Sequence, residues 1–78
     1  MSATLELITT TLRDKFKVTA DIAASTNIEE IGLDSLDFIN FLYTLEETTG
    51  VKIPDEDIES ENLESLADFA RYIDARRS

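Results

Sequence analysis

The sequence contains no cysteine, no histidine and no tryptophan. Without cysteine the chain can form neither a disulfide nor a thiolate metal site. Without histidine it can form neither a histidine metal centre nor a serine-histidine-aspartate triad. No apolar run is long enough to span a bilayer, and the N-terminal segment lacks the basic start and continuous apolar stretch of a signal peptide. We therefore expect no resident metal, no membrane partner and a cytoplasmic location.

Basic residues are also scarce. Seven Lys and Arg stand against 17 Asp and Glu, for a formal net charge of −10. Such a field repels phosphate backbones, so nucleic acid is not an expected partner, whereas proteins with basic patches would be attracted. Although high charge can mark disorder, 42% of the residues are hydrophobic and recur with a period. At 78 residues we expect one folded domain over residues 1–78, acting as a monomer.

Three stretches carry the apolar spacing of an amphipathic helix. The first covers residues 3–17. The second covers residues 36–48, and Gly50 follows where a left-handed C-terminal cap is expected. The last begins at Ser65, because Asp68 three residues later makes a near-match to a capping box. These are the three main helices of the predicted fold.

The connections are longer and less regular. Residues 18–33 lose the helical period and predict a long loop, pinned by the apolar side chains of Ile28, Ile31 and Leu33. An extended link through Pro54 leads to an acidic segment, and one short helical turn is predicted over residues 60–64. We therefore predict an all-α four-helix bundle with three main helices, one short helix and a long first loop.

The acidic segment that starts at Asp55 could be interpreted as a calcium loop. Its sixth position is Ser60 instead of glycine, and its twelfth is Leu66 instead of glutamate. An EF-hand is therefore rejected. A solvated acidic surface with weak affinity for divalent cations is the alternative that remains.

Ser35 lies where the long loop meets the second helix. In one interpretation, either Asp34 or Ser35 caps the helix, and the triplet D-S-L is too short to indicate more. In the other, Ser35 is covalently modified by another enzyme, because a phosphoester is tolerated at a helix N-terminus, and Asp34 and Asp37 serve recognition. Catalysis by Ser35 itself is disfavoured, since the chain has no histidine and no lysine lies near it in sequence.

The second helix carries more apolar residues than one core-facing stripe requires. The surplus includes Phe38, Ile39 and Tyr43. Such residues either add packing or form a docking surface.

The segment IGLDSLDFINFLYTLEETTGVKIPDED resembles the acyl carrier protein family, whose members depend on phosphopantetheine. The likeness extends beyond D-S-L to the preceding G-L, the helix end L-E-E, the glycine after it and the run I-P-D-E-D. The flanking helices fit the four-helix bundle of that family. The resemblance therefore covers nearly the whole chain.

The resemblance implies a carrier that is not itself an enzyme. A phosphopantetheinyl transferase would link 4'-phosphopantetheine from coenzyme A to Ser35. The thiol of that arm would carry acyl or aminoacyl groups as thioesters between enzymes of fatty acid, lipid, polyketide or related biosynthesis. Loading ligases or synthases with basic docking patches are the other implied partners.

The resemblance also implies two sets of site residues. The partner-binding set is Asp34, Leu36, Asp37, Ile39, Asn40, Tyr43, Glu46 and Glu47. The set that would line an interior cargo cavity is Phe41, Leu42, Leu45, Ile53, Leu63 and Leu66.

Several residues depart from the pattern of carriers in fatty acid synthesis. Asn40 replaces a usual acid, Tyr43 a methionine or smaller apolar residue, and Thr48 and Thr49 an acid and a phenylalanine. The segment IESENLESL is longer by about two residues. These departures favour a specialised carrier for a polyketide, peptide, lipid or aminoacyl pathway. Aromatic side chains at Phe38 and Tyr43 would crowd the cavity and suit a short or polar cargo.

Two alternatives remain open. One is an aminoacyl or peptidyl carrier loaded by a dedicated ligase. The other, from a different class, is an unmodified acidic helical module that binds partners through the same second helix.

Overall fold

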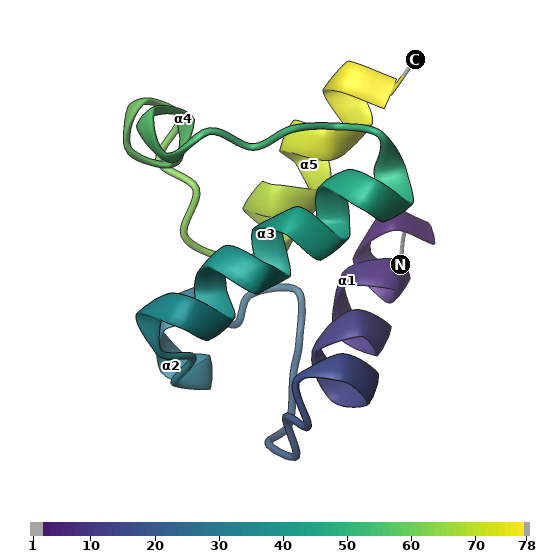
Figure 1. The fold of residues 1–78 in the computed structure, drawn as a ribbon, viewed down its shortest axis with the longest axis vertical. Coiled ribbons are helices and arrows are strands. Elements are labelled where there is room, and N and C mark those ends of the chain that lie inside the picture. The colour runs from purple at the N-terminus through teal and green to yellow at the C-terminus, as the bar shows by residue number, and fades with distance from the viewer. Residues whose placement is uncertain (1–2, 78) are drawn as a thin grey trace.

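A computed structural model describes residues 3–77, and this part of the chain forms five helices. They are α1 (Ala3–Lys15), α2 (Ile28–Ile31), α3 (Ser35–Thr49), α4 (Asp55–Ser60) and α5 (Leu66–Arg77). Figure 1 shows α1, α3 and α5 grouped together, with α2 at the start of α3 and α4 joined to the group by the segments before and after it. The predicted all-α fold with three main helices is confirmed. No helix within residues 3–77 has the length and hydrophobicity needed to cross a membrane.

The core lies between the apolar faces of the three main helices. Three phenylalanines connect it: the rings of Phe16 and Phe41 meet edge to face at 6.0 Å, and those of Phe41 and Phe69 at 6.5 Å. Each fully buried side chain of this size contributes roughly 1.5–3 kcal/mol to folding. Seven large side chains are almost completely inaccessible: Ile8, Leu12, Phe41, Leu45, Leu66, Phe69 and Ile73.

The ends of α1 and α3 follow from local backbone chemistry. Gly50 has a φ of 77° and its N–H donates to the carbonyl of Glu46 at 2.8 Å, which confirms the predicted left-handed cap of α3. Helix α1 ends at Lys15, two residues earlier than predicted. The reason is that Lys17 adopts a φ of 58°, outside the helical region.

The stretch predicted as a loop over residues 18–33 contains a helix that the prediction missed. Asn27 caps α2 by accepting a hydrogen bond from the N–H of Glu29 at 2.9 Å, and Gly32 ends α2 with a φ of 84°. The predicted anchoring is confirmed, since Ile28 is buried and Ile31 and Leu33 pack against the core. With four residues, α2 is too short to produce a helical period in the sequence.

The end of the long loop is fastened to the start of α5 by backbone pairing. Asn27 and Ser65 form an isolated antiparallel bridge. Three backbone hydrogen bonds surround it: Ile28 N to Glu64 O at 2.8 Å, Leu66 N to Thr26 O at 3.0 Å, and Ala67 N to Ala24 O at 2.9 Å. This pairing holds α2 beside the segment that precedes α5.

The short helix predicted over residues 60–64 was placed too late, because α4 spans Asp55–Ser60. Pro54 precedes it in extended conformation, and the acidic residues of the first turn suit the positive end of the helix dipole. The chain then turns at Asn62, which has a φ of 53°, and Leu63 returns to the core. The acidic segment is thus a helix instead of a loop.

Candidate functional site

Asp34, and not Ser35, caps helix α3. Asp34 has extended backbone angles, and its Oδ1 accepts a hydrogen bond from the N–H of Asp37 at 2.7 Å. The Asp34 carbonyl accepts from the N–H of Phe38 at 2.9 Å, which begins the helical ladder. Ser35 is therefore the first helical residue, where a hydroxyl is not required for capping.

The Ser35 side chain is exposed at this helix end. Within residues 3–77 its hydroxyl takes part in no side-chain hydrogen bond, because Asp34 satisfies the amide that a capping serine would bind. The chain has no histidine that could act as its base. The hydroxyl can thus be reached by another enzyme, and no residue between 3 and 77 is hydrogen-bonded to it to activate it.

An apolar groove of about 310 Å³ opens beside Ser35. It is bounded by α2, the start of α3, α4 and the segment before α5. Its apolar lining consists of Ile28, Leu33, Phe38, Ile58 and Leu63. Its polar lining consists of Asn27, Glu29, Asp34, Ser35 and Glu64. A flexible group attached to Ser35 could lie in this groove with its apolar parts against the hydrophobic lining.

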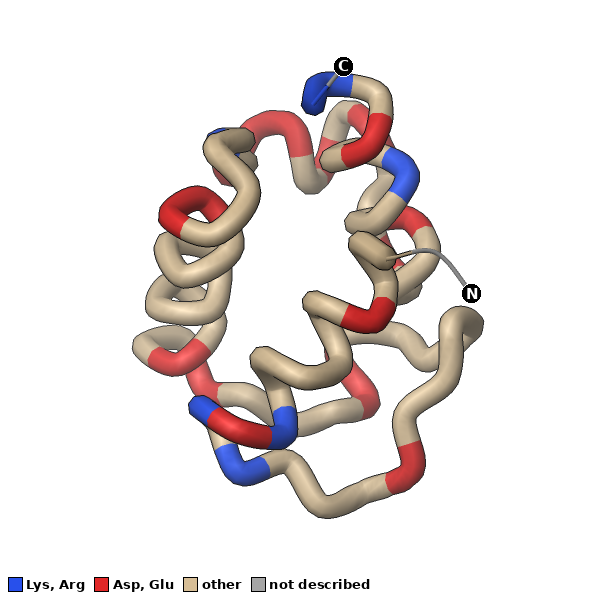
Figure 2. Tube along the Cα trace, turned by 90° about the vertical axis from the view of Figure 1, so that its right-hand side faces the viewer, with Lys and Arg blue, Asp and Glu red and all other residues tan. Residues whose placement is uncertain are grey.

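The surroundings of Ser35 are strongly acidic. In Figure 2 the red positions are spread over most of the trace, whereas most blue ones gather near the C-terminus and at the end of α1. Among residues 3–77, the side chains that line the groove include three carboxylates and neither lysine nor arginine. An anionic ester at Ser35 would be stabilised by the α3 dipole, and the surrounding carboxylates would attract a basic partner surface.

The outer face of α3 carries three large exposed hydrophobic side chains. Leu36, Ile39 and Tyr43 are 67%, 44% and 59% exposed, and their spacing places them on one side of the helix. Asn40 and Glu47 are exposed as well, while Glu46 is half-buried. A monomer rarely leaves such a stripe uncovered without a binding role.

A second groove, of about 240 Å³, runs along this face of α3. It lies between α3 and the link that leads to α4. Its lining consists of Ile39, Leu42, Tyr43, Glu46, Lys52, Ile53, Pro54 and Asp55. Part of the predicted partner-binding set therefore borders a groove instead of a flat surface.

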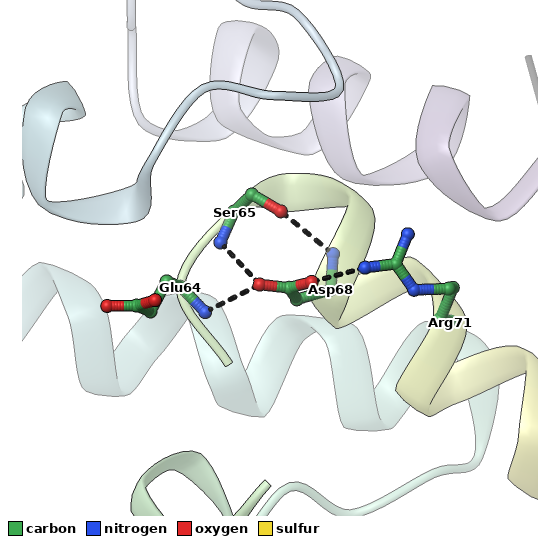
Figure 3. A network of polar contacts seen from close by, with 4 residues as sticks. All are labelled: Glu64, Ser65, Asp68 and Arg71. Carbon is green, nitrogen blue, oxygen red and sulfur yellow. Dashed lines mark hydrogen bonds and ion pairs between the residues drawn. The ribbon is translucent and has the colours of Figure 1, made fainter. Parts of the chain in front are cut away.

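Helix α5 also begins with a serine and an aspartate, Ser65 and Asp68, and here the serine is the cap. Asp68 N–H donates to Ser65 Oγ at 3.1 Å, while Asp68 Oδ2 accepts from the N–H groups of Ser65 at 3.0 Å and Glu64 at 3.1 Å (Figure 3). Arg71 also pairs with Asp68. The predicted capping box is confirmed. The backbone hydrogen bond from Ser65 is the largest influence that lowers the pKa of the Asp68 carboxyl below its usual value.

Comparison with known proteins agrees with this geometry. The family described as "Phosphopantetheine attachment site" matches residues 6–73. An acyl carrier protein of Clostridium perfringens is 38% identical over 64 residues, covering 80% of this chain and 82% of that protein. The chain belongs to the acyl carrier protein family. An acyl carrier protein of Akkermansia muciniphila is 43% identical over 58 residues, which cover 74% of this chain and 66% of that protein.

Solved carrier proteins have the same fold. One is a chain in the crystal structure of Bradyrhizobium japonicum glycine:[carrier protein] ligase complexed with its cognate carrier protein and an analogue of glycyl adenylate. The TM-score is 0.78 at 21% identity, over 96% of this chain and all of that one. A second comes from the complex with glycylated carrier protein. It gives a TM-score of 0.64 at 25% identity, over 86% of this chain and 89% of that one.

Family membership confirms three predictions. The first is that the chain is an acyl carrier protein, and the second is that such proteins are not enzymes themselves. The third is that their cofactor is 4'-phosphopantetheine. The structure fits that cofactor, because an exposed serine hydroxyl stands at a helix N-terminus beside an apolar groove. When bound, the arm contributes the thiol that the cysteine-free chain lacks.

The predicted cargo-cavity residues are distributed between the core and the two grooves. Phe41, Leu45 and Leu66 are completely buried in the core. Of the six, only Leu63 lines the groove beside Ser35. Leu42 and Ile53 are also buried and border the second groove. Their role toward a cargo stays a prediction.

Tyr43, predicted to crowd the cavity together with Phe38, does not line the groove beside Ser35. Tyr43 lies on the outer face of α3, 59% exposed, and lines the second groove. It follows Ser35 by eight residues, which is about 12 Å along a helix axis. Phe38, by contrast, is half-buried, packs against the core and lines the groove beside Ser35.

Sequence reasoning missed several residues of the groove beside Ser35. Asn27 caps α2, Glu29 belongs to α2, Ile58 belongs to α4, and Glu64 precedes α5. Asn27 carried a usable signal, since a capping asparagine followed five residues later by glycine is typical of a short helix. The position of Glu64 depends on the backbone pairing with Ile28, which has no signature in the sequence.

Proposed function

We propose that the chain carries acyl or aminoacyl groups as thioesters on a 4'-phosphopantetheine arm attached to Ser35 Oγ. The observation that carries this proposal is the division of roles at the start of α3, where Asp34 caps the helix and the exposed Ser35 hydroxyl forms no hydrogen bond with any side chain of residues 3–77. Family membership supports the same cofactor. No other feature of the described residues combines an exposed hydroxyl, a helix N-terminus and an adjoining apolar groove.

Attachment of the arm requires a partner enzyme. A phosphopantetheinyl transferase would form the bond between Ser35 Oγ and the phosphorus of the pantetheine half while the phosphoanhydride of coenzyme A breaks. Adenosine 3',5'-bisphosphate would leave, and the hydroxyl proton would pass to the transferase. Ser35 has no base of its own, so the transferase has to provide one. Asp34 and Asp37 lie on either side of Ser35 in the sequence and would serve recognition.

Partner enzymes would dock on the outer face of α3 through basic surfaces. The exposed side chains of Leu36, Ile39 and Tyr43 give apolar contact area. Asn40, Glu46 and Glu47 lie along the same helix, and the carboxylates would steer arginine and lysine of a partner toward it. Charge reversal at Glu46 and Glu47 should therefore slow association more at low salt than at high salt.

The cargo belongs to one of two classes, acyl or aminoacyl. Two features favour an aminoacyl group: the aromatic ring of Phe38 takes up part of the lining beside Ser35, and the structurally similar carriers occur in complexes with a glycine:[carrier protein] ligase. Offering the phosphopantetheinylated protein to aminoacyl and fatty-acyl ligases would separate the classes. Loading by long-chain acyl ligases alone would contradict the aminoacyl assignment.

The remaining expectations form part of the same proposal. We propose one domain over residues 1–78 that acts as a monomer in the cytoplasm. The single cluster of buried apolar side chains, to which α1, α3 and α5 all contribute, is the support for one domain. Light scattering coupled to size-exclusion chromatography would measure the oligomeric state.

Intact-mass spectrometry tests the proposed function. The chain would be incubated with coenzyme A, magnesium and a promiscuous phosphopantetheinyl transferase. We expect one added arm on the wild type and on S65A, and none on S35A. S65A is the matched control because Ser65 begins a helix, as Ser35 does, but caps it. A wild-type mass that does not change would contradict the carrier function and favour the unmodified interaction module.

A further inference from the structure

Helix α4 has fewer stabilising contacts than the three main helices α1, α3 and α5. It has six residues, none of them buried, and Pro54 before it gives no side-chain cap. Asp55, Glu56, Asp57 and Glu59 all lie within it, so like charges repel along its length. Short helices with little buried surface open at low free-energy cost.

One side chain of α4 nevertheless forms part of the groove beside Ser35. Ile58 is half-buried, packs against the core and lines that groove together with Phe38 and Leu63. Because Phe38 belongs to the well-packed α3 and Leu63 is buried, Ile58 is the lining residue whose helix has the fewest constraints. A shift of α4 would therefore move Ile58 and change the width of the groove.

A single side-chain hydrogen bond ties α4 to another helix within residues 3–77. The hydroxyl of Tyr72 on α5 donates to Asp57 Oδ2. In the same range no lysine or arginine forms an ion pair with a carboxylate of α4. This hydrogen bond is thus the main polar restraint on the helix.

The donor of this hydrogen bond is itself rigidly placed. The Tyr72 ring is buried, and the guanidinium carbon of Arg76 lies 3.6 Å from the ring centroid. Burial and then the hydrogen bond to Asp57 raise the pKa of the Tyr72 hydroxyl, so it keeps its proton at neutral pH. Burial and the Arg76 contact therefore restrain the position of the Tyr72 ring and its hydroxyl.

We propose that Tyr72 and Asp57 are positioning residues that hold α4, and through it Ile58, against the groove beside Ser35. Their hydrogen bond sets how closely the groove encloses whatever is attached to Ser35. Its effect on the arm rests on the proposed function, whereas its effect on α4 does not. The two effects can therefore be tested separately.

The first experiment uses the unmodified chain and measures amide hydrogen exchange. The reporters are the amides of Glu61 and Leu63, which donate to the carbonyls of Asp57 and Ile58. In Y72F we expect these amides to exchange about five to ten times faster, since one such hydrogen bond contributes on that scale. Amides in the middle of α1 should exchange at the wild-type rate.

Three further variants separate the hydrogen bond from general effects. D57A should reproduce the Y72F effect, whereas D57N keeps an acceptor oxygen and should lie closer to the wild type. E59Q removes a neighbouring charge of α4 without touching Tyr72, and because it only reduces the repulsion within α4, it should not make the reporter amides exchange faster. Reporter amides that exchange at the wild-type rate in Y72F would overturn the proposal. An equal increase in the exchange rates of α1 and α5 would overturn it as well.

The second experiment uses the phosphopantetheinylated chain and measures alkylation of the arm thiol by iodoacetamide. A looser groove shields the arm less, so the thiol of Y72F should react two to five times faster than that of the wild type, on the order expected for one lost hydrogen bond. Faster exchange in α4 with unchanged alkylation would overturn the link to the groove. A chain that acquires no arm would instead contradict the proposed function, while the exchange result would stand.

Discussion

Helices α3 and α5 both begin with an aspartate and a serine, but the two residues exchange roles. At α5 the serine comes first and caps the helix, and Asp68 three residues later accepts hydrogen bonds from the backbone before it. At α3 the aspartate comes first and caps the helix, and Ser35 follows as the first helical residue. The same two residue types therefore give a closed hydrogen-bond network in one place and an unbonded hydroxyl in the other.

This difference shows how a serine at a helix start can be kept available for chemistry. A capping serine uses its oxygen to stabilise the helix, so its modification would cost a hydrogen bond. Ser35 avoids that conflict because Asp34 already satisfies the backbone. An arm can then be attached at the positive end of α3 without loss of the cap.

The largest effect on stability is expected from D68A. Asp68 accepts two backbone hydrogen bonds and pairs with Arg71, so its removal should lower the free energy of unfolding by about 2 kcal/mol. Urea denaturation followed by circular dichroism would measure the change. E64A is the matched control. It removes the neighbouring carboxylate but keeps the backbone N–H of residue 64, which still donates to Asp68. An equal loss in both variants would contradict the capping role.

This contribution of Asp68 should depend on pH. Its pKa is lower in the folded chain than the usual 3.8, so folding favours the ionised carboxylate. The stabilisation is therefore fully present above the unfolded pKa and is lost as the pH falls through the folded pKa. We expect the difference in unfolding free energy between wild type and D68N to shrink below pH 3.8 in denaturation series at several pH values. A difference that stays constant there would show that ionisation is not involved.

A smaller effect is expected at the start of α3. D34A removes the cap and should cost about 1 kcal/mol, whereas D34N keeps an acceptor oxygen and should stay within about 0.5 kcal/mol of the wild type. Thermal and chemical unfolding would measure both. If D34A were as stable as D34N, another group would have to cap the helix, and the hydroxyl of Ser35 would be the first candidate.

The smallest effect should come from Ser35 itself. S65A loses a capping hydrogen bond and should be destabilised by about 1 kcal/mol, while S35A should change stability by no more than about 0.5 kcal/mol. The same unfolding assay would compare the two alanine variants. Equal destabilisation would mean that Ser35 also has a structural role.

The sequence predicts the long elements well and the short ones poorly. Helices α1, α3 and α5 bury one face each, so their apolar residues recur at helical spacing. Helices α2 and α4 have four and six residues, too few for a period, and depend on Asn27 and Pro54 at their starts. The prediction therefore missed one and shifted the other.

The candidate site likewise has one part that the sequence predicts and one part that it does not. Ser35 and Asp34 are recognisable because their roles depend on residues close in sequence. The groove depends on contacts between distant segments, such as the backbone pairing of Ile28 with Glu64. The hydrogen bond between Tyr72 and Asp57 likewise joins residues that no local pattern relates.

The most direct test of the central claim is to locate the arm by fragmentation mass spectrometry. The wild-type chain would be treated with coenzyme A and a phosphopantetheinyl transferase, digested and sequenced by fragmentation. We predict the 4'-phosphopantetheine mass on Ser35 and an unmodified Ser65 in the same sample. An arm on Ser65 or on any residue other than Ser35 would contradict the account.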